Sequence, residues 1–189
     1  PIGRAYDLEK RLGCSDVCAL VNYKALLKPY RVFRAKGYPH PKALAFAAAA
    51  HGACLGMRLG QRAGNGAGID VAAVSGFDES FNALWERAAR GYRAIGVRDR
   101  AFLQWRFMQC PTRRYRVAAA SRNDTLAGYL VYRIAEKDGI RYGHVIDLLA
   151  ERGDRGGLDA LLAWALRDMR AQDADMATCS IAPIPDYDR

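Results

Sequence analysis

Long uninterrupted hydrophobic runs are absent from this sequence of 189 residues. The longest apolar segment, residues 43–57, is rich in alanine and is interrupted by His51 and two glycines. It is therefore too short and too weakly apolar to span a bilayer. The N-terminus also lacks the basic segment, apolar stretch and cleavage site of a secretory signal. These absences predict a cytoplasmic protein without a transmembrane segment.

Cysteine is scarce, and the cysteines present are scattered and odd in number. They are Cys14, Cys18, Cys54, Cys110 and Cys179. This pattern is not the disulfide framework of a small secreted domain. Cys14 and Cys18 stand one helical turn apart, but no second pair of ligands follows them, so we expect no zinc site and no other metal site. Buried free thiols are the favoured interpretation.

Acidic residues are rare in the first third of the chain. Residues 1–63 contain eleven Lys or Arg against three Asp or Glu, whereas the remaining residues contain eighteen against seventeen, and the formal net charge is +9. A basic segment of this kind can attract nucleic acid, anionic lipid or a phosphorylated substrate. However, basic and aromatic residues do not interleave as they do in RNA-binding modules, so the nucleic-acid signal is weak. A solvated basic surface is the alternative.

Hydrophobic periodicity predicts the order of secondary structure. Residues 27–41 read as a connector, residues 42–62 as an Ala-rich helix and residues 64–68 as a Gly-rich break. From Ile69 the predicted order is strand, helix, helix, three antiparallel strands, a long helix over 157–171, and a final strand. Asp99 is a predicted N-cap, as is either Asp78 or Ser80. This order predicts an α+β fold, an α/β sandwich whose mixed, mostly antiparallel sheet is flanked by helices.

One block of residues in this part of the chain resembles a known family. It reads VRDRAFLQWRFMQCPTRRYRV from Val97 and is followed by LAGYLVYR and GHVIDLLA. The residues that carry the likeness are Arg98, Asp99, Leu103, Trp105, Arg106, Pro111 and Tyr115. With the element order, the block resembles the GCN5-related N-acetyltransferase (GNAT) superfamily, and more narrowly bacterial proteins with two such domains in tandem. The resemblance covers residues 69–181.

The resemblance implies a division of the chain into three parts. Leu12 and Gly13 fill the places where a helix ends in a GNAT domain, so residues 1–40 are predicted to be the tail of a preceding domain. Residues 41–68 would be a helical connector with a Gly-rich break, and residues 69–189 an acyltransferase domain lacking its last elements. The alternative is that the N-terminal tail completes the sheet of the second domain, in a permuted or swapped arrangement. A homodimer or a domain-swapped assembly is a further expectation.

The resemblance also implies a cosubstrate, acetyl-CoA or another acyl-CoA. It would lie where the strand over residues 140–150 separates from its neighbour, with its pyrophosphate on the next loop and helix N-terminus. The superfamily loop reads Arg/Gln-x-x-Gly-x-Gly/Ala, and aligning Arg152 with its first position leaves Arg155 in place of the first Gly. The predicted cofactor-binding residues are Leu148, Leu149, Arg152, Gly153, Arg155, Gly156 and Gly157.

The charges of this loop oppose one another. Arg152 and Arg155 would favour a pyrophosphate, whereas Glu151, Asp154 and Asp159 would oppose it. The alternative to a binding loop is a surface loop whose glycines only turn the chain.

Acyl transfer also requires a base for the attacking group. The candidates are Asp147 and His144, which are three residues apart on one strand, so we expect their side chains on opposite faces of the sheet. A structural role is the alternative for both. Tyr129, Tyr132 and Tyr142 could protonate a leaving thiolate, or simply pack. We expect Trp105, Arg106 and Tyr142 on the acceptor side. For Trp105 and Arg106 the alternative is a place in the core, with an ion pair between Arg106 and a carboxylate.

The resemblance implies direct acyl transfer from acyl-CoA to an amine or hydroxyl of a small molecule, a glycan or a peptide. Catalysis would then depend mainly on positioning and on polarisation by the backbone. Two alternatives stay open at this point. One is a GNAT-like domain that has lost catalysis and serves for binding or as a scaffold. The other is a binder of nucleic acid or of an anionic surface through the basic first segment.

Overall fold

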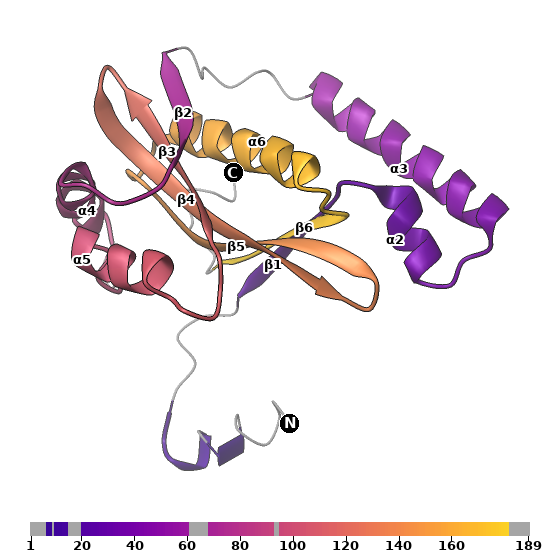
Figure 1. Cartoon of the computed structure of the whole chain (residues 1–189), viewed down its shortest axis with the longest axis horizontal. Coiled ribbons are helices and arrows are strands. Elements are labelled where there is room, and N and C mark those ends of the chain that lie inside the picture. Colours follow the sequence, from indigo (N-terminus) through magenta and orange to yellow (C-terminus); the bar gives the residue numbers. More distant parts are fainter. Residues whose placement is uncertain (1–6, 9, 15–19, 61–67, 93–94, 182–189) are drawn as a thin grey trace.

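A mixed sheet of six strands lies at the centre of the computed structural model, which describes residues 7–8, 10–14, 20–60, 68–92 and 95–181 (Figure 1). The strands are β1 (Val21–Leu26), β2 (Ile69–Val74), β3 (Arg116–Arg122), β4 (Thr125–Lys137), β5 (Ile140–Ala150) and β6 (Met176–Ile181). Their order across the sheet is β1-β6-β5-β4-β3-β2. Only β5 and β6 run parallel. The predicted α+β class with a mostly antiparallel sheet is confirmed.

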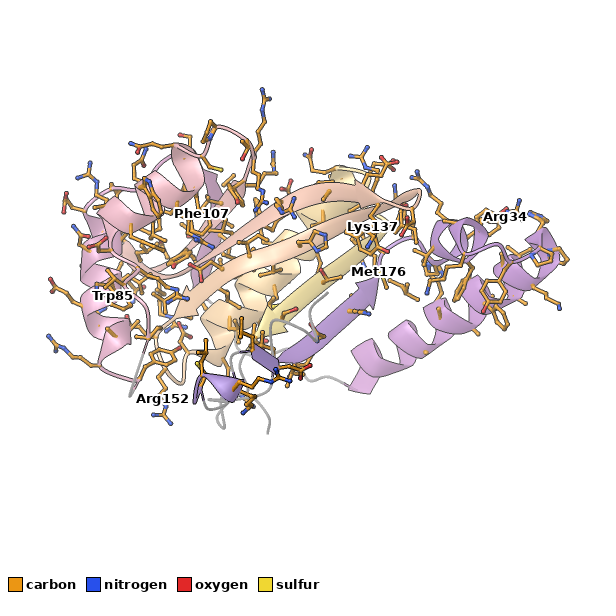
Figure 2. All side chains as sticks on the ribbon, turned by 90° about the horizontal axis from the view of Figure 1, so that it is seen from below. Arg34, Trp85, Phe107, Lys137, Arg152 and Met176 are labelled. Atoms are coloured by element: carbon orange, nitrogen blue, oxygen red, sulfur yellow. The ribbon has the colours of Figure 1, made fainter. Side chains whose placement is uncertain are left out.

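Helices cover both faces of the sheet, and each face has its own hydrophobic core. One face carries α4 (Ser80–Ala89), α5 (Arg100–Leu103) and a π-helical turn, η1 (Gln104–Met108). Their core includes the buried Phe81 and Phe107 and the partly buried Trp85 (Figure 2). The opposite face carries α6 (Arg155–Ala171), which buries Leu161, Ala165 and Met169 against the sheet. The predicted order of elements from Ile69 onward is confirmed.

Two short turns fix the hairpins that join β3 to β4 and β4 to β5. Asn123 and Asp124 have φ of 48° and 59°, and Asp138 and Gly139 have φ of 54° and 71°. Two successive residues with positive φ match the right-handed twist of the strands that they connect, and Asn, Asp and Gly adopt such angles most readily. These turns set the register that places β5 beside β4.

The N-terminal segment completes the sheet. Strand β1 pairs antiparallel with β6, from Val21 opposite Ile181 to Leu26 opposite Met176. The alternative expectation, that the N-terminal tail completes the sheet, therefore agrees with this pairing. The division into a preceding domain, a connector and an acyltransferase domain stays a prediction. The Gly-rich break lies, apart from Gly68, outside the described residues.

Two helices follow β1. The predicted connector contains a short helix, α2 (Pro29–Ala35), because a proline at the first helical position already has the required φ and needs no N–H partner. The next helix, α3 (His40–Gly60), packs on α2 and extends away from the sheet (Figure 1). Within the described part of the chain, no helix has the length and apolar character needed to cross a membrane.

Ion pairs attach this N-terminal segment to the turn between α6 and β6. The backbone N–H groups of Leu27 and Lys28 donate to the carbonyl of Asp175 at 2.9 and 3.0 Å. Arg31 lies 3.2 Å from the buried carboxylate of Asp175. Lys28 and Arg31 also pair with Asp173. Two cations of the basic segment therefore serve internal contacts.

The described cysteines are not buried as predicted. Cys14 is exposed, because it directly follows the turn at Gly13, where no core lies, and Cys110 and Cys179 are partly buried. The prediction is thus wrong for Cys14 and too strong for the other two. Cys18 and the side chain of Cys54 lie outside the described residues.

Candidate functional site

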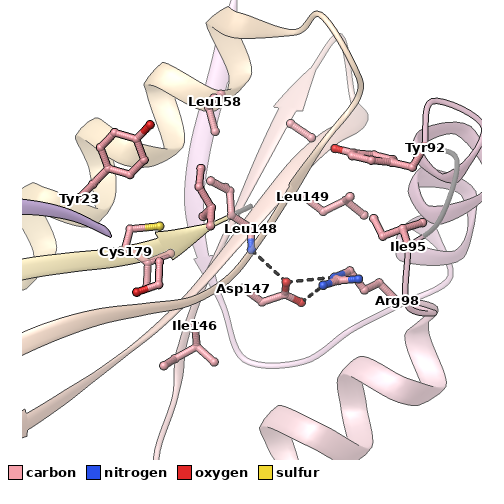
Figure 3. A pocket seen from close by; sticks show the side chains of 14 residues that line it. Tyr23, Tyr92, Ile95, Arg98, Ile146, Asp147, Leu148, Leu149, Leu158 and Cys179 are labelled. Atoms are coloured by element: carbon pink, nitrogen blue, oxygen red, sulfur yellow. Dashed lines mark hydrogen bonds and ion pairs between the residues drawn. The ribbon is translucent and has the colours of Figure 1, made fainter. Parts of the chain in front are cut away.

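Strands β5 and β6 pair over only part of their length. The parallel ladder joins Tyr142–Val145 to Met176–Cys179, whereas residues 147–150 of β5 pair, among the described residues, with β4 alone. A cavity of about 450 Å³ opens where the two strands separate (Figure 3). Residues 145–150 of β5 line it on one side, and Tyr23 of β1 and Cys179 of β6 line it on the other. Because no described residue pairs with this β5 segment on the β6 side, its backbone can bind an extended ligand.

A β-bulge lies at the same point of β5. Val131 of β4 is opposite Asp147, whereas the next residue of β4, Tyr132, is opposite Val145, so that Ile146 is the extra residue. Ile146 therefore packs against the α4–α5 core, and Asp147 bonds to Tyr129 of that same core. A bulge re-aims the side chains that follow it.

This bulge corrects the expected geometry of the two candidate bases. Val145 packs on the α6 side of the sheet, so its neighbour His144 lies on the α4–α5 side. Asp147 lies on the α4–α5 side as well. The expectation that His144 and Asp147 point to opposite faces is therefore wrong, because an extra residue between them shifts the alternation by one.

Asp147 is held by three donors. Its carboxylate accepts from Arg98 Nε at 3.0 and 3.2 Å, from Tyr129 Oη at 2.9 Å and from the N–H of Leu148 at 3.1 Å (Figure 3). Only 11% of its side chain is exposed. Burial alone would lower the pKa of Arg98, but the charge of Asp147 and the hydrogen bond to it, with smaller contributions from Tyr129 and Tyr92, together raise the pKa overall. Asp147 therefore serves as the anion of a buried ion pair, and it is not a free proton acceptor.

Two of the three tyrosines considered as proton donors bond to carboxylates. Burial, reinforced by the charge of Asp147, raises the pKa of Tyr129 far above its ordinary value. Tyr132 donates to Asp168 on the α6 side, where Arg116 Nε also pairs with that carboxylate at 2.6 Å. Burial likewise raises the pKa of Tyr132. Both hydroxyl groups thus stay protonated, and their protons already have acceptors.

His144 and Tyr142 lie on the part of β5 that pairs with β6, before the separation begins. The two rings stack with centroids 5.5 Å apart and planes 9° from parallel. The Nδ1 atom of His144 lies 2.7 Å from the hydroxyl of Thr178. Burial and the charge of Arg133 lower the pKa of His144, which favours the neutral imidazole. Neither ring lines the cavity between β5 and β6.

The predicted cofactor-binding residues fall into three groups. Leu148 and Leu149 line the cavity between the separated strands. Arg152 and Gly153 line a second hollow of about 380 Å³, which they share with Arg122. The remaining three, Arg155, Gly156 and Gly157, form the first turn of α6. The structure therefore places all seven along one path, from β5 to the N-terminus of α6.

The charges of this loop have internal partners. Arg152 donates to the carbonyl of Gly91 at 3.1 Å, and Glu151 pairs with Arg87 at 2.7 Å. Asp154 is the N-cap of α6 and accepts from the N–H of Gly157 at 3.0 Å. Arg122 donates to the same Asp154 oxygen at 2.9 Å. Asp154, one of the acids expected to oppose a pyrophosphate, thus lies at the positive, N-terminal end of the α6 dipole.

Two of the three predicted acceptor residues, Trp105 and Arg106, lie in η1, whereas Tyr142 lies on β5. Trp105 is 62% exposed, so the alternative that placed it in the core is wrong. The guanidinium of Arg106 lies over the rings of Phe102 and Phe107, 5.9 and 5.6 Å from their centroids. Among the described contacts of Arg106, these two rings are found where an ion pair with a carboxylate was expected. The wider π turn η1 changes the directions of Trp105 and Arg106, and such turns are frequent at functional sites.

Arg106 lines a further cavity of about 320 Å³ with Val97 and Phe102. Arg98, Ile146 and Asp147 line both this cavity and the one between β5 and β6. Sequence reasoning listed Arg98 only as part of a motif and did not single out Arg122, Tyr23 or Cys179. Their roles depend on contacts between distant segments, for which the sequence carries no local signal.

The element order and the separation of β5 from β6 are those that the resemblance to the GNAT superfamily implied. No protein-family model matches the sequence, and no curated protein does either. Among solved structures, an aminoglycoside acetyltransferase from an uncultured soil metagenomic sample is 14% identical, with a TM-score of 0.47 over 64% of this chain and 82% of that chain. The ribosomal-protein-alanine N-acetyltransferase of Brucella melitensis biovar Abortus 2308 is 14% identical, with a TM-score of 0.48 over 63% and 84%.

A third solved structure is the glucosamine-6-phosphate N-acetyltransferase of Arabidopsis thaliana, which is 11% identical, with a TM-score of 0.44 over 60% of this chain and 82% of that chain. The TM-scores of all three structures lie below 0.5. The GNAT-like description therefore rests on the strand order and the site of this chain itself.

Proposed function

We propose that the chain is an acyl-CoA-dependent acyltransferase that moves an acyl group directly to an amine or hydroxyl. The observation that carries this proposal is the cavity between β5 and β6, together with residues 146–150, which pair with no described residue on the β6 side. An extended pantetheine arm with two amides can bind there as a short extra strand. Backbone N–H groups of β5 would then polarise the thioester carbonyl.

Two cavities meet at the reacting position. The larger would hold the acyl donor, and the smaller, lined by Arg106 and Phe102, would admit the acceptor. Ile146 and Asp147 line both, so the bulge lies where the donor and acceptor would meet. Holding two reactants in such an arrangement can supply much of the rate enhancement without a strong base. The acceptor would be a small molecule, a glycan or a peptide.

Asp147 is the better placed of the two candidate bases, because it lines both cavities and His144 lines neither. Its carboxylate already accepts from Arg98 and Tyr129, so we assign it the role of orienting Arg98 and the bulge. This assignment makes it a positioning residue. His144 would act indirectly, through the strand that it helps to hold at Thr178.

A second function, binding or scaffolding without catalysis, is favoured by a specific observation. The N-cap Asp154 accepts the hydrogen bond from the N–H of Gly157, a donor that a pyrophosphate would need. Both carboxylate oxygens of Asp147 already accept hydrogen bonds, which leaves this residue poorly suited to accept a proton. The third reading, a basic anchor for nucleic acid or lipid, is weakened because Lys28 and Arg31 pair with Asp173.

Calorimetric titration of acetyl-CoA tests the donor site. The wild-type protein should bind acetyl-CoA, and its unfolding temperature should rise at millimolar ligand. Leu158→Trp, which places a large ring in the cavity from α6, should abolish both effects. The matched control is Ala163→Trp, at an exposed position of the same helix, and it should bind as the wild type does. A folded wild-type sample that shows no binding at millimolar acetyl-CoA would refute the proposal.

Thiol release separates an enzyme from a scaffold. Incubation with acetyl-CoA and a panel of primary amines and alcohols should liberate free CoA faster than in the protein-free control. Binding of acetyl-CoA without acceptor-dependent release across the panel would favour the scaffold. Release that Leu158→Trp removes and Ala163→Trp retains would assign the activity to this cavity.

A further inference from the structure

The carboxylate of Asp154 occupies the N-terminus of α6. One of its oxygens accepts from the N–H of Gly157 at 3.0 Å and from Arg122 at 2.9 Å. The side chain is only 12% exposed, although it stands in a loop. A Cβ built on Gly157 would lie 2.6 Å from the other oxygen of this carboxylate. Glycine at this position is therefore what leaves room for the carboxylate.

A phosphate group would need these same donors. Helix N-termini bind anions through their free N–H groups, with nearby arginines completing the site. Here Asp154 already neutralises Arg122 and already takes the N–H of Gly157. Two anions cannot share these donors without strong repulsion in a site that is largely withdrawn from water. Another cation of the loop, Arg152, donates to the carbonyl of Gly91.

We infer that Asp154 is a specificity-determining residue that keeps the diphosphate of an acyl donor away from α6, so that the donor is recognised through its acyl-pantetheine arm alone. This inference rests on the proposed function and deepens it. The cavity between β5 and β6 is about 450 Å³, within the range of small-molecule sites, and Leu148 and Leu158 give it an apolar lining for such an arm. The preferred donor class is then a pantetheine thioester whose nucleotide contributes nothing to affinity.

Calorimetry with two probes tests this inference on the full chain. Acetyl-CoA and S-acetylpantetheine carry the same thioester arm, and only the first carries a diphosphate. In the wild-type protein we expect dissociation constants within about threefold of each other, because the donors that would bind the diphosphate have an internal partner. Binding of acetyl-CoA more than tenfold tighter than S-acetylpantetheine would overturn the inference while supporting the proposed function.

Variants at Asp154 supply the second part of the test. Asp154→Asn keeps a good N-cap without the charge, and Asp154→Gly removes the side chain at a position that tolerates glycine. Each should tighten acetyl-CoA about fivefold or more, by freeing Arg122 and the helix end, and leave S-acetylpantetheine unchanged. The matched control Asp138→Asn, in the distant turn between β4 and β5, should change neither constant.

The remaining outcomes are also decisive. Unchanged acetyl-CoA affinity in both Asp154 variants would overturn the inference, because the carboxylate would then not be what excludes the diphosphate. No binding of either probe to any of these folded proteins would refute the proposed function, and the inference with it. Tightening of both probes to the same degree would show a change in the cavity itself, and would also count against the inference.

Discussion

The guanidinium of Arg98 and the carboxylate of Asp147 form a wall shared by two cavities. The Nε atom of Arg98 lies 3.0 and 3.2 Å from the two carboxylate oxygens, and both residues line the cavity on either side. They come from different segments, Arg98 from the chain just before α5 and Asp147 from the bulged part of β5. This pair therefore connects the helical layer to the strand on which the proposed chemistry depends.

Removing one member of this pair should destabilise the fold. In Arg98→Met, Asp147 stays largely buried without its cation, and the free energy of unfolding should fall by about 2–3 kcal/mol. The double variant Arg98→Met with Asp147→Leu should lose less than Arg98→Met alone, because no uncompensated charge remains. Urea denaturation measures both. The exposed Arg114→Met is the control and should stay within about 0.5 kcal/mol of wild type. A double variant less stable than Arg98→Met would contradict this account.

A close contact between Gly143 of β5 and Met169 of α6 sets the distance from this helix to the sheet. A Cβ on Gly143 would overlap the side chain of Met169, which is fully buried. Gly143→Ala should therefore lower the free energy of unfolding by about 1–3 kcal/mol. Gly52→Ala, in α3 with open space around it, should be neutral or stabilise by about 0.5–1 kcal/mol. Thermal unfolding of the two variants checks the contrast, and equal effects would be evidence against close packing at Gly143.

Stability should depend on pH partly through His144. Burial and Arg133 hold the pKa of His144 below its ordinary value of 6.5, so the unfolded state takes up more protons as the pH falls. The contribution of His144 is thus present above about pH 6.5 and is lost as the pH drops through the lowered pKa. Between pH 7.5 and pH 5, wild type should lose more unfolding free energy than His144→Gln. Parallel curves over this range, measured by urea denaturation, would rule this contribution out.

The alkylation rate of Cys179 should report occupancy of the cavity, with Cys110 of the same molecule as the internal reference. Burial raises the pKa of Cys179, which lines the cavity, whereas a backbone hydrogen bond from Thr112 lowers the pKa of Cys110. Alkylation at pH 7.5 should therefore modify Cys110 faster, because the thiolate is the reactive form. Acetyl-CoA should slow the modification of Cys179 and leave Cys110 unchanged, as followed by peptide mass spectrometry. Equal protection of both thiols would place the ligand elsewhere.

Local sequence signals predicted most of the fold from Ile69 onward. Periodicity located the strands and helices, and Asp99 caps α5 as predicted, by accepting from the N–H of Phe102 at 2.7 Å. Two features escaped prediction. The prolines and Gly37 around residues 29–35 read as a connector and hid α2. The π turn after α5 differs from an α-helix by a backbone shift that side-chain periodicity does not reveal.

The candidate site was only partly accessible from the sequence. The binding role of residues 147–157 stays a prediction, but the succession of strand, loop and helix over them was predicted, because it follows from the chain itself. The bulge at Ile146 was not, since one extra residue leaves the apolar pattern of β5 nearly unchanged. Partners such as Arg98 for Asp147 and Arg122 for Asp154 lie 49 and 32 residues away, beyond the reach of any local rule.

The place of β1 at the edge of the sheet constrains the order in which the protein can form. Asn22 bonds to Ser180, a residue 158 positions later, so β1 leaves the ribosome long before its partner β6 and must wait for it. Pairings at such separation carry a large loop-closure cost and form slowly. Until β1 pairs with it, the edge of β6 stays uncovered, and the cavity lacks the wall that Tyr23 forms. The cavity between β5 and β6 is thus completed only at the end of folding, and nascent or truncated chains should lack a ligand-competent form.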